Sequence, residues 1–318
     1  MERGKAEGKR RQNAEYSPRT DLALEIRESF EEDDVEIRGV VLERNPGITE
    51  GIEISRVVIR DERGAAAMGK PIGTYITIEA PKLKSAGEEY KEQLSKEIAG
   101  QLREMCRDLR QKRILVAGLG NRDATPDALG PMVVDQLFVT RHLIREFGKD
   151  FKEKHGLADV SAVAVGVMGQ TGMESFEILK GIIRETKPEL IIAVDALAAR
   201  NVERMNATVQ LTDTGINPGA GIGNNRKALN EESLGAPVIA IGVPTVVDAA
   251  TIVSDSMERF LNAQGFSEEE NQQFLFEIRE SARSGETGGL FVTPKNIDEA
   301  VKQISIIISE ALNMCFTE

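Results

Sequence analysis

The feature that most constrains this fold is the alternation of short apolar runs with amphipathic segments in residues 113–261. "RILVAGLG" (113–120) and "ELIIAVDAL" (189–197) are almost continuously apolar, as is typical of strands covered on both faces. Between them, residues 173–187 place apolar side chains at three- and four-residue spacing, which predicts an amphipathic helix. This order predicts an α/β fold with a largely parallel central sheet and helices on both faces. Further strands are expected at 160–167 and 236–244, and further helices at 84–109, 128–147, 246–261 and 296–314.

The N-terminal part of the chain has a different pattern. Residues 1 to about 20 are polar and basic, which predicts a solvated extension. From about 38 to 82, segments rich in Val, Ile and Thr alternate apolar with polar residues, as strands with one exposed face do. Gly-containing stretches at 46–47 and 64–73 supply the expected turns. We therefore expect a β-rich insertion or subdomain before the central α/β part.

Composition excludes several classes of protein. The net charge of −12 argues against general affinity for nucleic acid, and no apolar run is long enough to span a bilayer. We also expect no secretory signal, because the first residues lack an apolar core. The two cysteines, Cys106 and Cys315, lie far apart in helical contexts and are interpreted as free thiols of a reducing compartment.

Candidate chemistry is expected in the loops that follow the carboxyl ends of the strands, where open α/β sheets bind ligands. Two nucleotide-binding motifs that could occur there are incomplete or absent. Gly118-Leu119-Gly120 lacks the third glycine of the dinucleotide fingerprint, and no P-loop motif occurs. The four loops are 118–130, 166–174, 194–200 and 242–251.

Elimination leaves carboxylates as the catalytic candidates. The only histidines, His142 and His155, lie outside the four loops, so a nucleophile with a histidine base has no base there. Asp127 precedes an expected helix and Asp195 ends a strand, so both side chains can face one crevice. Two carboxylates in a partly dry site do not ionise together readily, so one can hold a proton while the other accepts one from water. The alternatives are structural: Asp127 as a helix N-cap, Asp195 as a turn acceptor, and Asp248 as a helix cap or a neighbour that tunes the pair.

Several unusual blocks span nearly the whole chain, from about Tyr16 to the last helix. They are "SPRTDLALE", "RNPGITEGIEIS", "GKPIGTYITIEAP", "GLGNRDATPDALGP", "GVMGQTGMES", "VDALAAR", "TDTGINPGAGIGNNR" and "IGVPTVVDAAT". Together these blocks resemble the germination protease family of endospore-forming bacteria. The central part is also similar to the hydrogenase-maturation peptidases.

The resemblance implies an endopeptidase that degrades small acid-soluble DNA-binding spore proteins during germination. The family is regarded as an atypical aspartic type, and its two functional aspartates correspond to Asp127 and Asp195. It is made as a zymogen that shortens itself after an acidic residue. "RTDLALE" matches that cleavage context, so we expect a propeptide of residues 1–21, a cut between Asp21 and Leu22, and a single mature domain, 22–318. The resemblance further implies a homotetramer in the cytoplasm of the forespore and spore core, with no cofactor and no metal.

Two alternatives to this function stay open at the level of the sequence. One is a metal-dependent peptidase with Asp127 and Asp195 as ligands, and the other is a non-enzymatic α/β ligand-binding module. The sequence also leaves open which groups donate hydrogen bonds to a developing oxyanion. Backbone amides around Gly169 and Gly172 or in segment 217–225 are candidates. The acid-rich site suggests mild acidification as the trigger of processing.

Overall fold

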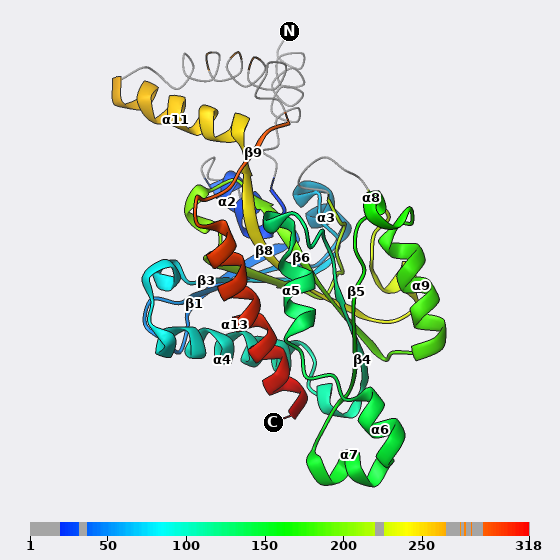
Figure 1. The fold of residues 1–318 in the computed structure, drawn as a ribbon. Coiled ribbons are helices and arrows are strands. Elements are labelled where there is room, and N and C mark those ends of the chain that lie inside the picture. The colour runs from blue at the N-terminus through cyan, green and yellow to red at the C-terminus, as the bar shows by residue number, and fades with distance from the viewer. Residues whose placement is uncertain are drawn as a thin grey trace.

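The computed structural model describes residues 20–31, 37–219, 226–264 and 289–317, together with positions 274, 277 and 281. Within these residues the backbone forms one nine-stranded mixed sheet, flanked by helices on both faces (Figure 1). Of the predicted propeptide, residues 1–19 lie outside the described residues, as does 220–225 of the candidate oxyanion segment. The strands are β1 (Val40–Pro46), β2 (Glu53–Ile59), β3 (Gly73–Glu79), β4 (Arg113–Gly118), β5 (Asp159–Ala164), β6 (Leu190–Ala199), β7 (Thr208–Thr212), β8 (Val238–Asp248) and β9 (Phe291–Val292).

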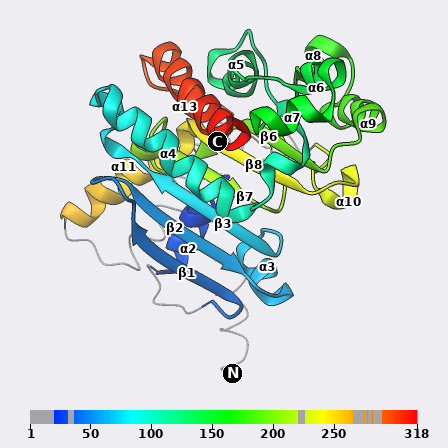
Figure 2. The same cartoon turned by 90° about the horizontal axis from the view of Figure 1, so that it is seen from below.

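The sheet has a parallel half and an antiparallel half. Its order is β1-β2-β3-β7-β8-β6-β4-β5, with β9 on β8. The pairs β5–β4, β4–β6 and β6–β8 are parallel, whereas β7 pairs antiparallel with β8 and with β3. The α/β class is confirmed, and the β-rich N-terminal segment extends the same sheet through β7 (Figure 2).

The helices follow the amphipathic patterns of the sequence. The longest are α2 (Ala23–Glu31), α4 (Glu88–Met105), α9 (Ser175–Thr186), α11 (Ala249–Gln264) and α13 (Ile297–Thr317). The shorter ones are α3 (Glu62–Met68), α5 (Leu129–Asp135), α6 (Arg141–Phe147), α7 (Lys149–His155), α8 (Met168–Thr171) and α10 (Glu231–Leu234), with 3-10 turns η1 (Pro81–Ser85), η2 (Leu109–Gln111), η3 (Thr125–Asp127) and η4 (Val202–Arg204).

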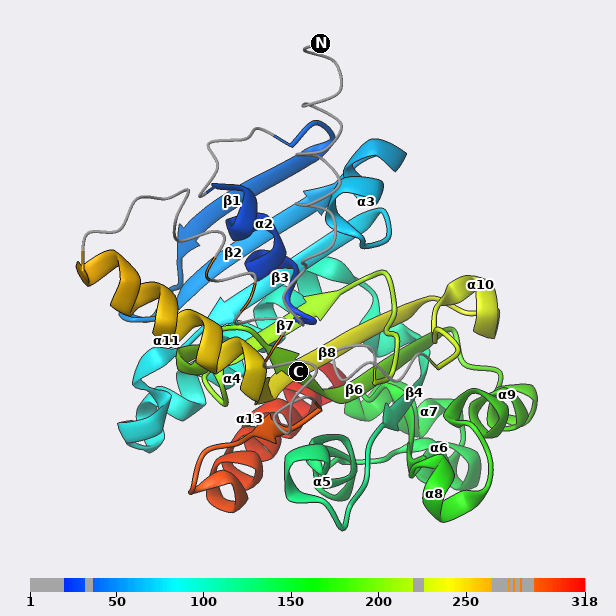
Figure 3. The same cartoon turned by 90° about the horizontal axis from the view of Figure 1, so that it is seen from above.

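Two layers of helices bury the sheet. The main core joins α4, α5 and α13 to one face, through residues such as Leu102, Leu129 and Ile308. On the other face α9 covers the parallel strands through Leu179, and α2 covers β2 and β3 through Leu24 (Figure 3). The sheet therefore holds the carboxyl ends of β4, β6 and β8 in a fixed framework.

The helix predicted over 128–147 is interrupted. It divides into α5 and α6, with Thr140 between them. The Thr140 amide donates to the carbonyl of Val160, and its hydroxyl accepts from the Val160 amide at 2.9 Å. These tertiary hydrogen bonds to β5 replace the helical ones, so the chain bends there.

Candidate active site

The loop after β4 turns the carboxylate of Asp127 back toward the sheet. Asp127 ends η3, and its Oδ2 accepts a 2.7 Å hydrogen bond from the Asn121 amide. The hydroxyl of Thr245 in β8 holds the turn by donating to the Pro126 carbonyl at 2.6 Å. The N-cap of α5 is Ala128, which has no side-chain cap bond, so Asp127 does not cap that helix.

Gly120 makes this turn possible. Its φ of +103° is unfavourable for residues with a side chain. A Cβ at this position would also lie 2.0 Å from the backbone oxygen of Asp127 and 2.9 Å from its Oδ1. The position of the Asp127 carboxylate therefore depends on residue 120 being a glycine, which has no side chain.

Asp195 lies in β6, just beyond the part of the strand that β4 covers. The β4–β6 pairing ends at Val194, whereas β6 continues beside β8 to Ala199. The Asp195 side chain is buried, with 5% of the residue exposed, and its Oδ1 accepts from the Ala196 amide at 2.9 Å.

The Asp127 carboxylate is close enough to Asp195 to raise the pKa of that buried carboxyl. Burial, followed by the charges of Asp127 and Asp21, raises the pKa of Asp195 well above its ordinary value. Burial also raises the pKa of the half-buried Asp127, although the Asn121 amide and the charge of Arg226 oppose that rise. Since Asp195 is the more deeply buried, it is the carboxyl better suited to keep a proton.

The predicted cleavage site lies against β6, the strand that carries Asp195, and the charge of Asp21 acts on the Asp195 carboxyl. The Asp21 amide donates to the Ala198 carbonyl at 2.9 Å, and the Ala198 amide donates to Asp21 Oδ2 at 2.9 Å. Leu22 is fully buried in a cluster that includes Leu197, Met205 and Val247. The Asp21 carboxylate is thus bound by the backbone of β6, and the Leu22 side chain is bound by a separate apolar cluster.

Two side chains contact the carbonyl oxygen of Asp21. Lys70 Nζ donates to it at 2.9 Å, and Gln210 Nε2 donates to it at 3.2 Å. The Oε1 of Gln210 accepts from the Ala23 amide at 2.7 Å, so one amide group touches the chain on both sides of Leu22.

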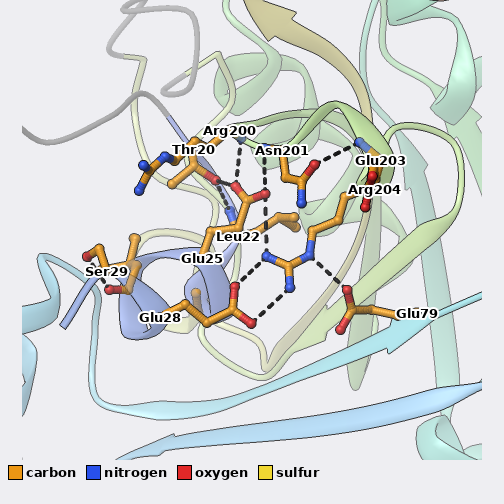
Figure 4. Close-up of polar contacts among 12 residues, drawn as sticks. Thr20, Leu22, Glu25, Glu28, Ser29, Glu79, Arg200, Asn201, Glu203 and Arg204 are labelled. Carbon is orange, nitrogen blue, oxygen red and sulfur yellow. Dashed lines mark hydrogen bonds and ion pairs between the residues drawn. The ribbon is translucent and has the colours of Figure 1, made fainter. Parts of the chain in front are cut away.

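A partly buried charge cluster around Arg204 fixes the segment that follows (Figure 4). The Arg204 guanidinium donates to Glu28 at 2.7 and 2.9 Å and to Glu79 at 2.8 Å, and it lies 3.5 Å from Glu25. Burial alone would lower the pKa of Arg204, but its bonds with Glu28 and Glu79 raise it. Glu25 also accepts from the amides of the β6–η4 loop, so α2 is attached to the strand that bears Asp195.

The other predicted residues have structural surroundings. Asp248 ends β8, and its Oδ1 accepts from the Ala250 amide at the start of α11, as a helix cap does. Gly169 and Gly172 lie in and after α8; Gln170 between them donates to Asn121 and so links this turn to the Asp127 loop. The pattern in the sequence did not reveal Lys70 or Gln210, because a turn and an unpredicted strand bring them to the site.

A comparison of the sequence with known families identifies a match over residues 19–285 to the germination protease model. The chain belongs to the germination protease family. It is 46% identical over 307 residues to the germination protease of Caldanaerobacter subterraneus, with 93% of each chain covered. Its identity is 41% with that of Clostridium perfringens and 36% with that of Bacillus mycoides, each over at least 94% of both chains.

Membership of the germination protease family makes this chain a protease of spore germination. In the described part of the chain, no group of three or more His, Cys, Asp and Glu side chains is arranged to hold a metal ion. None of the helices described there is both long and apolar enough to cross a bilayer.

Proposed function

We propose that this germination protease is a self-processing endopeptidase of the atypical aspartic type. It is made as a zymogen, removes residues 1–21 and then degrades small acid-soluble spore proteins by cutting after acidic residues. The observation that supports this most strongly is that Asp21 hydrogen-bonds to β6, the strand of Asp195, and that its charge is close enough to raise the pKa of Asp195.

In the proposed mechanism the two aspartates have different roles. Asp195, which is buried and has the more strongly raised pKa, holds the proton at rest and acts as general acid. Asp127 is half-buried and accepts from a backbone amide, so it is the ionised partner that takes a proton from the attacking water.

The zymogen is inactive toward other proteins because its own chain fills the site. Asp21 is hydrogen-bonded to the backbone of Ala198, and Leu22 fills the apolar pocket that a substrate side chain would need, until the cut releases Asp21 and lets the new N-terminus at Leu22 leave that pocket. Since the segment is bound to its own β6, cleavage occurs within one molecule. The first-order rate should therefore be independent of protein concentration.

Acidification is the proposed trigger. Asp21, Asp127 and Asp195 place three carboxyls close together, with Arg226 as a nearby cation. The charged forms repel one another, so a mildly acidic pH favours the arrangement in which Asp195 is protonated and the pair is active. Equal processing rates at neutral and mildly acidic pH would contradict this part of the proposal.

Two further parts of the proposal rest on the family resemblance. They are assembly as a homotetramer, which sedimentation would measure, and residence in the forespore and spore core.

The substrate preference is tested with a synthetic peptide of residues 16–27 and the processed protein. We expect one cut after the position of Asp21, and none when Leu22 of the peptide is replaced by Lys, because the apolar pocket excludes a charge. Asp127→Asn and Asp195→Asn proteins should cut neither this peptide nor the acid-soluble spore proteins. Cleavage by either variant at the wild-type rate would exclude the proposed pair.

A further inference from the structure

We propose that Lys70 and Gln210 are catalytic residues that stabilise the oxyanion formed on the scissile carbonyl. Both donate to the same oxygen, that of Asp21, at 2.9 and 3.2 Å. This inference rests on the proposed cleavage between Asp21 and Leu22, and it names the donors for that reaction.

The fold holds the two donors in place from different elements. Lys70 follows α3, and its amide is fixed by a hydrogen bond to the carbonyl of Ala65 at 3.3 Å. Gln210 lies in β7, buried between β3 and β8. Because Gln210 Oε1 accepts from the Ala23 amide, its Nε2 is the atom that faces the Asp21 carbonyl. The orientation of this side-chain amide is thus determined by the peptide itself.

Lys70 contacts the reacting group of Asp21 rather than its side chain. Its ammonium donates to the backbone carbonyl, whereas the carboxylate of Asp21 accepts from the Ala198 amide. A donor to the carbonyl serves any substrate peptide, whatever its acidic side chain. Burial lowers the pKa of Lys70, although the charge of Asp21 opposes this shift, and a mildly acidic pH favours the charged form.

In the proposed hydrolysis, Lys70 and Gln210 stabilise the negative charge that develops on the carbonyl oxygen. Water oxygen bonds to the carbonyl carbon of Asp21 and loses a proton to Asp127, while the carbonyl oxygen becomes an oxyanion held by Lys70 and Gln210. The carbon–nitrogen bond then breaks, and the Leu22 nitrogen takes the proton of Asp195. Charge-stabilising donors of this kind contribute most when they are already in position before charge develops.

The test measures the self-processing rate of the full chain by intact mass. Lys70→Ala should lower the rate by about 10²–10³-fold. Added methylammonium should restore part of it, whereas tetramethylammonium, which has no N–H, should not. Gln210→Glu keeps the acceptor for Ala23 but removes the donor to the carbonyl, so it should also be slow. The exposed Lys84 provides the matched control, since Lys84→Ala should process at the wild-type rate.

Either of two results would overturn the assignment. One is a rate for Lys70→Ala within about tenfold of wild type. The other is slow processing that methylammonium does not relieve, because a lysine that only positions the segment would give that result. The proposed function fails separately: if Asp127→Asn and Asp195→Asn process normally, the aspartate mechanism is wrong whatever Lys70 does.

Discussion

Replacing Gly120 by Ala should disable the site without unfolding the protein. The backbone there has a φ of +103°, so an alanine is strained by roughly 1–2 kcal/mol. The added Cβ would also lie 2.0 Å from the Asp127 backbone oxygen, where real Cβ atoms keep at least 3.0 Å. The Asp127 turn must therefore move by about 1 Å, a displacement that can lower an enzymatic rate by about 10²-fold.

Gly235, which follows α10, provides a matched control for this substitution. Its φ is +79°, so alanine is also strained there, but nothing lies within 4 Å of the Cβ position. We expect Gly120→Ala to process its propeptide about 10²-fold more slowly than Gly235→Ala, although both lose about the same intrinsic stability. Intact mass gives the rates and thermal unfolding gives the stabilities. If a folded Gly120→Ala protein processes as fast as Gly235→Ala, then the position of Asp127 does not govern the reaction.

Three further predictions concern the charge cluster, the buried acid and metal ions. Arg204→Met leaves the buried Glu25 and the partly buried Glu79 without this partner, so it should lower the free energy of unfolding by about 3–5 kcal/mol. Arg44→Met, at a surface pair with Glu28, should lower it by less than about 1 kcal/mol in the same denaturant titration. For Asp195, the native state keeps its proton above the unfolded-chain pKa of 3.8, so wild-type stability falls as pH rises from there until Asp195 ionises. Asp195→Asn should thus be more stable than wild type near neutral pH, by about 1.4 kcal/mol for each unit by which the pKa of Asp195 is raised. This gain should vanish near pH 3.8. A stability difference that stays constant between these pH values would contradict the prediction. EDTA should leave the processing rate unchanged, because carboxylates activate the water in this account, whereas a loss that an added metal ion reverses would favour the metal-dependent alternative.

The sequence was most informative where local pattern and tertiary environment agree. The strands β4, β6 and β8 are mostly apolar, and α9 has a single apolar face, so their type and order were predictable. The rule that ligands bind beyond the carboxyl ends of parallel strands then selected the loops of Asp127 and Asp195.

The rest of the fold depends on contacts that no local pattern encodes. "TVQLT" (208–212) is too short to be distinguished from a loop, yet β7 joins the two halves of the sheet and presents Gln210. The turn predicted over 64–73 contains most of α3, which Asp61 caps, and this helix places Lys70. Nothing in the sequence indicated that Leu22 would be fully buried, because its buried neighbours come from β6, from β8 and from the loop after η4.

We propose that Asp127 and Asp195 together cut the chain between Asp21 and Leu22. Intact mass followed over time at mildly acidic pH, for wild type, Asp127→Asn and Asp195→Asn, tests this most directly. We predict that wild type loses residues 1–21 while both variants keep their full length. If all three proteins shorten alike, another protease removes the segment, and the two aspartates do not perform the cleavage.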